Sequence, residues 1–250
     1  MKSVVSPAAA AGLVLIRQTV SASPGGFGAE VLLGRRSGRS RFMPGIYVFP
    51  GGRVGPEDHQ PSGFAEPLPE PPPGLDRTTR QRLPVFARAA LRETYEETGL
   101  LLGAAQVASA PSPRRGAPGP GGSGLDGSGL DGSGLGGTAP WKAFAAAGLD
   151  PGFAGMRLVA RAITPANSPV RFHTRFFLAE GTAAVGEIAG DGELEDIHWA
   201  PIESLPELPM ADITHLVLEE ALAHHTGAGG PGRLAPLFHW IGPRRYVKSR

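Results

Sequence analysis

The distribution of apolar residues near the N-terminus predicts a β-hairpin. Residues 11–16 are almost wholly apolar and end at Arg17, and residues 30–33 form a second strand candidate. The segment 21–28 between them carries a Pro-Gly-Gly run, which breaks a strand and favours a turn. Residues 46–49 form a further short, β-rich run that stops at a Pro-Gly-Gly sequence. The first fifty residues therefore predict a hairpin followed by a short strand.

The N-terminal apolar run has a second interpretation, a secretory signal. Lys2 precedes the apolar stretch 4–16, and small residues follow at 21–23, where a cleavage site would lie. Pro7 falls early in the stretch and Arg17 interrupts it, so we favour a buried strand and expect a cytoplasmic protein. The stretch is also too short to span a bilayer.

Two segments have the spacing of apolar residues that is typical of a helix. The first spans residues 76–98, with Asp76 or Thr78 as its N-cap and Gly99 as a left-handed stop. The second spans about 212–225. Each segment is long enough to cover one face of a sheet.

A strictly alternating pattern at residues 170–178 predicts another strand. Its two faces differ, because one carries aromatic residues and the other carries Arg171, His173 and Arg175. An acidic loop at 191–196 follows and leads into a short apolar run. Strands and helices that interleave in this way, with a closing helix, indicate an α/β protein in which a mixed sheet is covered on two faces.

The boundaries predict a single domain over residues 8–228, with a C-terminal extension at 229–250. Two interruptions lie inside the domain: an irregular insertion at 59–76 and a flexible Gly/Pro-rich segment at 106–138. Within the second, a Gly-Ser-Gly-Leu-Asp repeat offers one apolar side chain per five residues, too little to offset the backbone entropy of its glycines. We expect it to act as a tether.

Charge and cysteine content narrow the range of functions. The chain has 24 Lys and Arg against 23 Asp and Glu, a net charge of +1, so charge gives no reason to expect a nucleic-acid or membrane partner. There is no cysteine, which excludes disulfide scaffolds, thiolate zinc sites and thiol nucleophiles. A small-molecule ligand is the partner we expect; the sequence does not predict an oligomeric state.

The candidate chemistry lies at the end of the first predicted helix. Glu96 and Glu97 fall about −60° and +40° around the helix axis from Glu93, so three carboxylates share one sector within a turn. Hard oxygen ligands on a rigid face suit Mg²⁺ or Mn²⁺. Arg92 can orient or neutralise this sector. The alternative is a solvated acidic helix face.

These residues resemble the Nudix hydrolase signature: Gly, five residues, Glu, seven residues, then Arg-Glu-apolar-x-Glu-Glu-x-Gly-apolar. The second half stands at residues 92–100, with Thr94 in place of the usual aliphatic residue. The first half is Gly52, five residues, then Asp58 instead of Glu. Between Asp58 and Arg92 lie 33 residues where the signature has seven. We call this signature the box. The long insertion inside it, together with the segment ending in Phe-Pro-Gly-Gly, resembles the peroxisomal coenzyme A diphosphatases.

The resemblance implies an α/β/α sandwich with a mixed sheet and assigns roles to residues of the box. It implies Arg92, Glu93 and Glu97 as catalytic residues, and Glu93, Glu96 and Glu97 as ligands of Mg²⁺ or Mn²⁺. The candidate substrate-binding residues are Arg36, Gly51, Gly52 and Arg53; for the two arginines, surface positions without a function are the alternative. The general base is Glu93 or a later carboxylate, Glu193 or Glu195, for which a plain surface loop is the alternative.

The implied reaction is metal-dependent hydrolysis of a diphosphate linkage in a nucleoside diphosphate derivative. The favoured substrate is coenzyme A or an acyl-coenzyme A, giving 3′,5′-ADP and phosphopantetheine or its acyl form. The alternatives are an ADP-ribose or nucleoside-diphosphate-sugar pyrophosphatase, and a non-catalytic nucleotide-binding module. The C-terminal residues 248–250 do not form a peroxisomal address, so we expect the cytoplasm.

Overall fold

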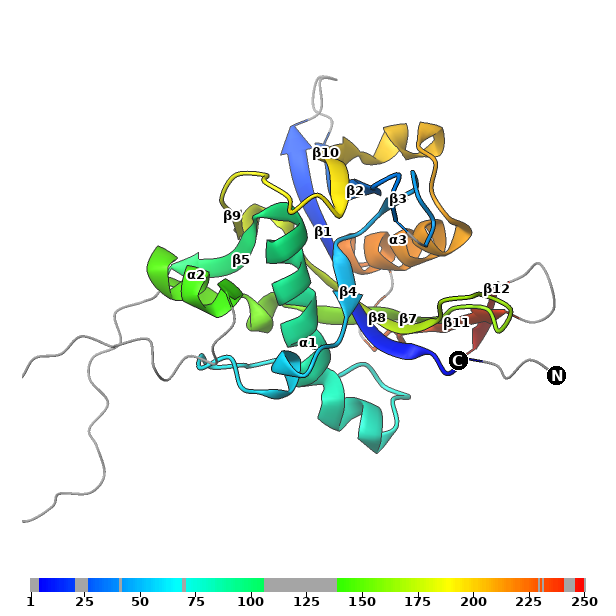
Figure 1. The fold of residues 1–250 in the computed structure, drawn as a ribbon, viewed down its shortest axis with the longest axis horizontal. Helices are drawn as coiled ribbons and strands as arrows, with labels where there is room; N and C mark the ends of the chain where they lie inside the picture. Colours follow the sequence, from blue (N-terminus) through cyan, green and yellow to red (C-terminus); the bar gives the residue numbers. More distant parts are fainter. Residues whose placement is uncertain are drawn as a thin grey trace, which may run out of the picture.

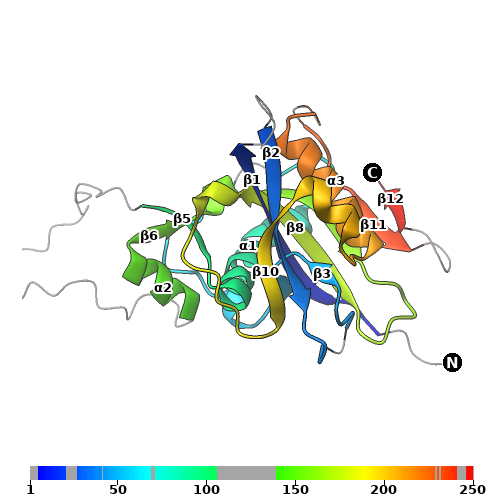
Figure 2. The same cartoon turned by 90° about the horizontal axis from the view of Figure 1, so that it is seen from above.

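A mixed β-sheet with a helix on each face forms the body of the protein (Figures 1 and 2). The computed structural model describes residues 5–20, 27–40, 42–68, 71–105, 139–228, 230, 232–240 and 246–249. Within these residues the sheet has nine strands, in the order β10-β2-β1-β8-β7-β11-β12, with β3 paired to β2 and β4 paired to β1. Its strands are β1 (Ala8–Val20), β2 (Phe27–Arg36), β3 (Tyr47–Val48), β4 (Gly51–Arg53), β7 (Arg157–Ile163), β8 (Phe172–Glu180), β10 (Leu194–Pro201), β11 (Leu237–Trp240) and β12 (Tyr246–Ser249).

The two main helices, α1 (Arg77–Thr98) and α3 (Asp212–His225), lie on opposite sides of the sheet in Figure 2. Each helix closes its own hydrophobic core against the sheet. One core centres on Leu13, Leu15 and Phe86, and the other on Val14, Ile16 and Val217. Successive residues of β1 thus point to opposite cores, as the pleat of a strand buried on both faces requires. The predicted α/β/α sandwich is confirmed.

The predicted hairpin is confirmed, and its strands extend beyond the apolar runs. The antiparallel register runs from Ile16 opposite Val31 to Val20 opposite Phe27. On its other edge β1 pairs in parallel with β8, from Ala8 opposite Phe172 to Ile16 opposite Glu180. The central position of β1 explains its continuous burial.

Strand β4, which the sequence does not predict, brings the Pro-Gly-Gly sequence against β1. Ala11 lies opposite Gly52, and Gly12 lies opposite Gly51. Gly51 has φ = 153°, and a Cβ atom there would lie 2.4 Å from the carbonyl oxygen of Ala11. A side chain has no room at this crossing, so glycine permits the close approach.

Helix α1 begins and ends where the sequence predicts. The Asp76 carboxylate accepts a hydrogen bond of 2.9 Å from the N–H of Thr79, which makes Asp76 the N-cap. Gly99 ends the helix with φ = 74°. The loop 186–190 packs around this end, since Ala189 N–H donates to the Thr98 carbonyl at 2.9 Å.

The smaller elements were not predicted. Strands β5 (Leu101–Ala105), β6 (Leu149–Pro151) and β9 (Ala184–Val185) form a second sheet, and α2 (Ala139–Ala147) packs beside it. Short 3₁₀ turns connect the elements: η1 (Glu57–His59), η3 (Phe153–Gly155), η4 (Gly181–Ala183) and η5 (Ile202–Glu207). The ring centroid of Trp141 lies 6.2 Å from that of Phe153, and that of Phe144 lies 6.4 Å from that of Phe64, which anchors α2.

Three predicted segments differ from or fall outside the observed structure. Residues 229–250, set apart in the sequence as an extension, contain β11 and β12, and β11 pairs with β7. The predicted acidic loop 191–196 overlaps β10, so Glu195 and Asp196 belong to a strand, where they follow Leu194 opposite Arg36. The glycine-rich segment 106–138 lies outside the described residues.

The insertion 59–76 is irregular, as predicted, but it packs against α1. Ser62 and Leu75 are buried, and Phe64 and Leu68 contact the core on the α1 side. Within the described part of the chain, no helix is long and apolar enough to cross a membrane.

Candidate active site

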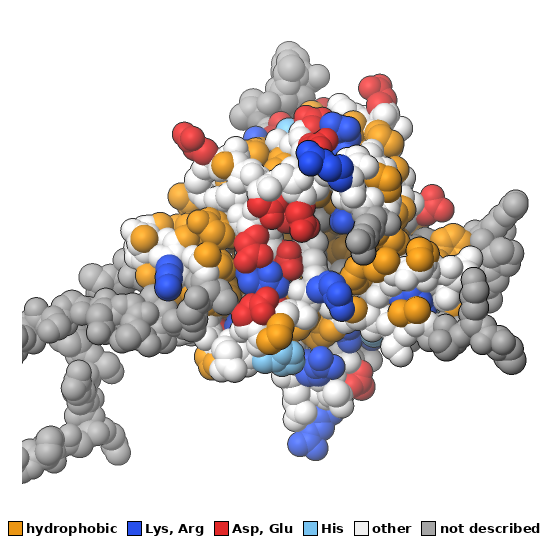
Figure 3. Space-filling view, in the orientation of Figure 1, with side chains coloured by type: hydrophobic (Ala, Val, Ile, Leu, Met, Phe, Trp, Pro, Cys, Tyr) orange, Lys and Arg blue, Asp and Glu red, His pale blue; other side chains and the backbone are white. Residues whose placement is uncertain are grey.

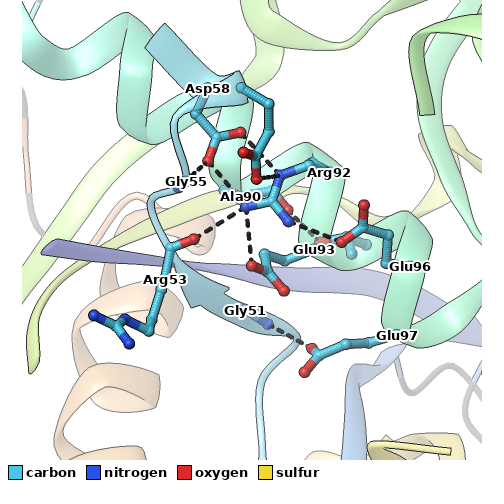
Figure 4. Close-up of polar contacts among 11 residues, drawn as sticks. Gly51, Arg53, Gly55, Asp58, Ala90, Arg92, Glu93, Glu96 and Glu97 are labelled. Atoms are coloured by element: carbon cyan, nitrogen blue, oxygen red, sulfur yellow. Dashed lines mark hydrogen bonds and ion pairs between the residues drawn. The ribbon is translucent and has the colours of Figure 1, made fainter. Parts of the chain in front are cut away.

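Strand β4 and the C-terminal half of α1 place the box residues side by side (Figure 4). The Gly51 N–H donates a hydrogen bond of 2.8 Å to Oε2 of Glu97. A Cβ atom on Gly52 would lie 2.4 Å from Cδ of Glu93, so the Glu93 carboxyl occupies the space that any side chain at position 52 would need. The structure thus places Gly51 and Gly52 of β4 directly against Glu97 and Glu93 of α1.

Arg92 is the centre of the polar contacts in this region (Figure 4). Its guanidinium donates to both carboxylate oxygens of Asp58 at 2.9 Å and to the Arg53 carbonyl at 3.0 Å. It also contacts Glu96 at 2.8 Å and Glu93 at 3.0 Å. The side chain is 7% exposed. Arg92 therefore holds two of the three clustered glutamates and ties them to β4.

Asp58 occupies the position where the family signature has Glu, and it anchors Arg92. The residue is 1% exposed, and its carboxylate also accepts a hydrogen bond of 2.8 Å from the Gly55 N–H. The bidentate geometry is the strong form of an arginine–carboxylate pair. Because Asp58 precedes the insertion, the 33 residues that follow it do not displace this anchor from Arg92.

A second arginine, which sequence reasoning missed, attaches the insertion to this network. Arg88 is buried. Its Nε donates a hydrogen bond of 2.7 Å to the Asp58 carbonyl, and its Nη1 forms an ion pair with the Glu66 carboxylate. Glu66 also accepts 2.9 Å from the Ser62 N–H. The only sequence signal for this residue is its position one turn before Arg92 on the same helix face. Arg88 thus links the insertion to the residue that orients Arg92.

Thr94, the other departure from the signature, is accommodated within the helix. It is 1% exposed, and its hydroxyl donates 2.7 Å to the Ala90 carbonyl one turn earlier. The hydroxyl is therefore satisfied inside the core and leaves no unpaired polar group there.

Burial shifts the protonation of the clustered carboxyls. Burial raises the pKa of Glu93 to about 7, with Arg92 opposing the shift and Glu96 adding to it. Burial likewise raises the pKa of Glu97 to about 8, against the hydrogen bond from Gly51, and the charges of Glu93 and Glu193 add to the shift. These are two neighbouring acids whose charged forms are costly unless a cation is present.

The donor set fits a divalent cation in its chemistry. Glu93, Glu96 and Glu97 offer hard carboxylate oxygens from one helix face, as Mg²⁺ and Mn²⁺ prefer. In the conformation described, Arg92 engages Glu93 and Glu96 while Gly51 engages Glu97. No three acidic or histidine side chains of the described residues converge closely enough to hold an ion as they stand. Each of Glu93 and Glu96 contacts Arg92 through one carboxylate oxygen, so each can offer its other oxygen to a cation once the three side chains shift to converge.

The remaining predicted site residues differ in how they affect the three glutamates. Arg36 acts on it electrostatically, because its charge lowers the pKa of Glu97, while its Nε donates 2.8 Å to the Phe42 carbonyl. The Arg53 side chain is exposed, and only its carbonyl contacts Arg92. Glu193 raises the pKa of Glu97, whereas Glu195 pairs with Arg35 at 3.2 Å. Of the two proposed bases outside the box, Glu193 thus acts on the cluster.

On the molecular surface the acidic side chains gather at the middle of one face, over α1, with basic side chains among and beside them (Figure 3). Phe49 is buried in the core on the α3 side. Trp199 is partly buried, with the Arg17 guanidinium carbon 4.2 Å from its ring centroid.

Comparison with known proteins gives two informative similarities. No protein-family model matches the chain. The acyl-coenzyme A diphosphatase NUDT19 of Gallus gallus is 37% identical over 110 residues, which covers 34% of this chain and 29% of that protein. The chain therefore matches less than a third of the length of that relative.

A crystal structure of a Nudix hydrolase from Alicyclobacillus acidocaldarius is 28% identical, with a TM-score of 0.62, and covers 96% of this chain and 100% of that chain. This similarity covers nearly the whole chain. The fold, the arrangement of the box residues and these two relatives together support a Nudix hydrolase.

Proposed function

We propose that the chain hydrolyses a diphosphate linkage in a nucleoside diphosphate derivative, using a divalent cation held by Glu93, Glu96 and Glu97. The observation that carries this proposal is the convergence of the box: α1 and β4 bring the three glutamates beside Gly51 and Gly52. A buried, Asp58-anchored Arg92 fixes two of these glutamates. A plain solvated acidic face does not require this buried support.

A divalent cation at this face supplies charge neutralisation for the diphosphate and activation of a water molecule. The chain's own residues supply the position and the proton acceptor. Arg92 orients Glu93 and Glu96 through direct contacts. Glycine at position 51 lets β4 lie close against β1, and glycine at position 52 leaves room for the Glu93 carboxylate.

In the proposed reaction the oxygen of water forms a bond to one phosphorus, and the bond from that phosphorus to the bridging oxygen breaks. The proton from water passes to a carboxylate oxygen, for which Glu93 and Glu193 are the candidates. The bridging oxygen stays with the leaving phosphate, so two monophosphates result. A carboxyl with a pKa near 7, such as that of Glu93, suits a general base near neutral pH.

We favour coenzyme A or an acyl-coenzyme A as substrate. The support is the partial similarity to the acyl-coenzyme A diphosphatase NUDT19 and the insertion inside the box. Cleavage would give 3′,5′-ADP and phosphopantetheine or its acyl form. The second candidate is an ADP-ribose or nucleoside-diphosphate-sugar pyrophosphatase, because the same carboxylates serve any diphosphate.

The test is product chromatography after incubation with coenzyme A, ADP-ribose or UDP-glucose, each with Mg²⁺ or Mn²⁺. Glu97→Gln is the inactive variant, and Glu219→Gln, at an exposed position on α3, is the matched control. Release of 3′,5′-ADP by the control but not by Glu97→Gln supports the proposal. Cleavage of another diphosphate alone would discard the substrate, and cleavage of none would favour a nucleotide-binding module.

A further inference from the structure

A cluster of basic residues lies beside the N-terminal half of α1, away from the glutamates. It consists of Arg82 on α1, Arg161 on β7, and His173 and Arg175 on β8. Arg161 and Arg175 are directly opposite in the antiparallel register. The guanidinium carbons of Arg175 and Arg82 lie 4.2 Å and 5.6 Å from the ring centroid of Phe86 on α1. The four side chains are thus held together by the sheet and by one aromatic ring.

The described part of the chain does not balance this positive charge. Arg82, Arg161 and Arg175 form no salt bridge with any described carboxylate. Asp76 acts on Arg161 and Arg175 electrostatically, but its carboxylate is exposed and caps α1. Like charges directly opposite on neighbouring strands are destabilising.

The pKa values of Arg175 and His173 are lowered by burial and by the neighbouring arginines. Burial, together with the charges of Arg82 and Arg161, lowers the pKa of Arg175 to about 10. Burial and the two neighbouring arginines lower the pKa of His173 to about 4, so His173 is neutral at pH 7. The arginines stay charged at neutral pH, and the field they create is positive.

Three buried nitrogen atoms of the cluster have no hydrogen-bond partner among the described residues. They are Nε of Arg161, Nε of Arg175 and Nε2 of His173. Arg175 is only 8% exposed. Buried polar atoms are nearly always paired, so three orphans on neighbouring residues indicate a group that these donors are built to receive.

We propose that Arg82, Arg161, His173 and Arg175 form a binding site for a phosphomonoester group. A phosphate has several acceptor oxygens and carries the charge that the arginines lack, and guanidinium groups bind it through paired N–H donors. Arg82 is exposed, Arg161 and His173 are half-buried and Arg175 is buried, so Arg82 is the member of the cluster that a phosphate would meet first.

The site lies within reach of the candidate active site. Ala11 of β1 pairs with Gly52 on one side and with Arg175 on the other, so the two positions are two strand spacings apart, about 10 Å. Along α1, Phe86 precedes Glu93 by about two turns, roughly 10 Å. A nucleotide that carries a phosphomonoester beside its diphosphate presents two anionic groups, and this cluster can receive the one that is not cleaved.

Binding is tested first without reference to activity. Inorganic phosphate is titrated into the full chain by calorimetry in chloride buffer, for the unsubstituted protein, Arg161→Gln and Arg82→Gln. Arg157→Gln, an exposed arginine on the same strand as Arg161, is the matched control. We expect each cluster variant to weaken phosphate binding about tenfold or more, and the control to leave it unchanged. Absence of phosphate binding, or equal effects of Arg161→Gln and Arg157→Gln, would overturn the proposal.

The source of the phosphate is tested by kinetics, and only this second test rests on the proposed function. The KM of coenzyme A is compared with that of 3′-dephospho-coenzyme A for the same proteins. If the phosphate belongs to the substrate, Arg161→Gln raises the KM of coenzyme A about tenfold and leaves that of the dephospho compound and both kcat values near those of the control. Unchanged KM values combined with lost phosphate binding would identify a free phosphate as the ligand. Since Arg82 is exposed, Arg82→Gln keeps both tests valid if Arg161→Gln fails to fold.

Discussion

The substitution Asp58→Asn tests the anchor on which the arrangement of the box depends. Asp58 is buried and receives two hydrogen bonds of 2.9 Å from Arg92 and one of 2.8 Å from the Gly55 N–H. Asparagine has a similar volume, but its amide places one donor against the guanidinium. The substitution therefore removes the charge and one acceptor without opening a cavity.

Breaking one partner of a buried ion pair costs about 3–5 kcal/mol of unfolding free energy. Arg92 keeps its contacts with Glu93 and Glu96, so we expect the lower end of that range, about 3 kcal/mol. For a domain of this size that corresponds to a fall in Tm of roughly 6–12 °C. Because Asp58 positions the residue that holds two proposed metal ligands, kcat should also fall, by about 10–100-fold.

The assay is urea unfolding at pH 7 together with initial rates at saturating Mg²⁺. Glu57→Gln is the matched control, because Glu57 lies 3.5 Å from Arg92 but is 36% exposed, and its loss should cost under about 1 kcal/mol. Asp58→Glu, which restores the signature residue, should recover part of the rate. Equal stability and equal rates for Asp58→Asn and Glu57→Gln would refute the anchoring role.

Three further predictions follow from the same contacts. Gly52→Ala should displace the flexible Glu93 carboxylate and lower kcat at least about tenfold with little loss of Tm, whereas Gly38→Ala, which meets nothing within 4 Å, should change neither. Glu66→Gln should leave Arg88 without its charge partner, lower the unfolding free energy by about 1–3 kcal/mol and speed limited proteolysis within the insertion. Unchanged proteolysis would argue against the attachment of the insertion to α1 by this ion pair. The pKa values of Glu93 and Glu97 in the folded protein are near 7 and 8, against an ordinary carboxyl pKa of 4.5. At pH values between these limits the folded protein retains protons that the unfolded chain has lost. The metal-free protein should therefore lose stability as pH rises from 5 to 8. Added Mg²⁺ should cancel that loss at pH 8, and a flat metal-free pH profile would contradict it.

The elements that the sequence predicts are those with strong local patterns. The β1–β2 hairpin, α1, β8 and α3 each combine a continuous apolar run or a periodic apolar face with a recognisable break or cap. The missed strands depend on distant partners instead. Strand β4 is three residues long and is defined by its fit against β1, and β11 is defined by its pairing with β7.

The same distinction applies to the candidate site. The grouping of Glu93, Glu96 and Glu97 follows from helix geometry and is visible in the sequence. Asp58 is separated from Arg92 by 33 residues of the insertion and the first turns of α1, and the pairing of Arg88 with Glu66 has no periodic signal. Contacts of this kind arise from tertiary packing, and local patterns do not encode them.

Hydrolysis of coenzyme A in ¹⁸O-labelled water tests the central claim most directly. With Mg²⁺ or Mn²⁺ present, mass spectrometry should find one ¹⁸O atom in one of the two monophosphate products and none in the other. Both products should be lost on addition of a chelator and in Glu97→Gln, but not in Glu219→Gln. Absence of any labelled monophosphate from coenzyme A, ADP-ribose and UDP-glucose alike would contradict the assignment of this site to diphosphate hydrolysis.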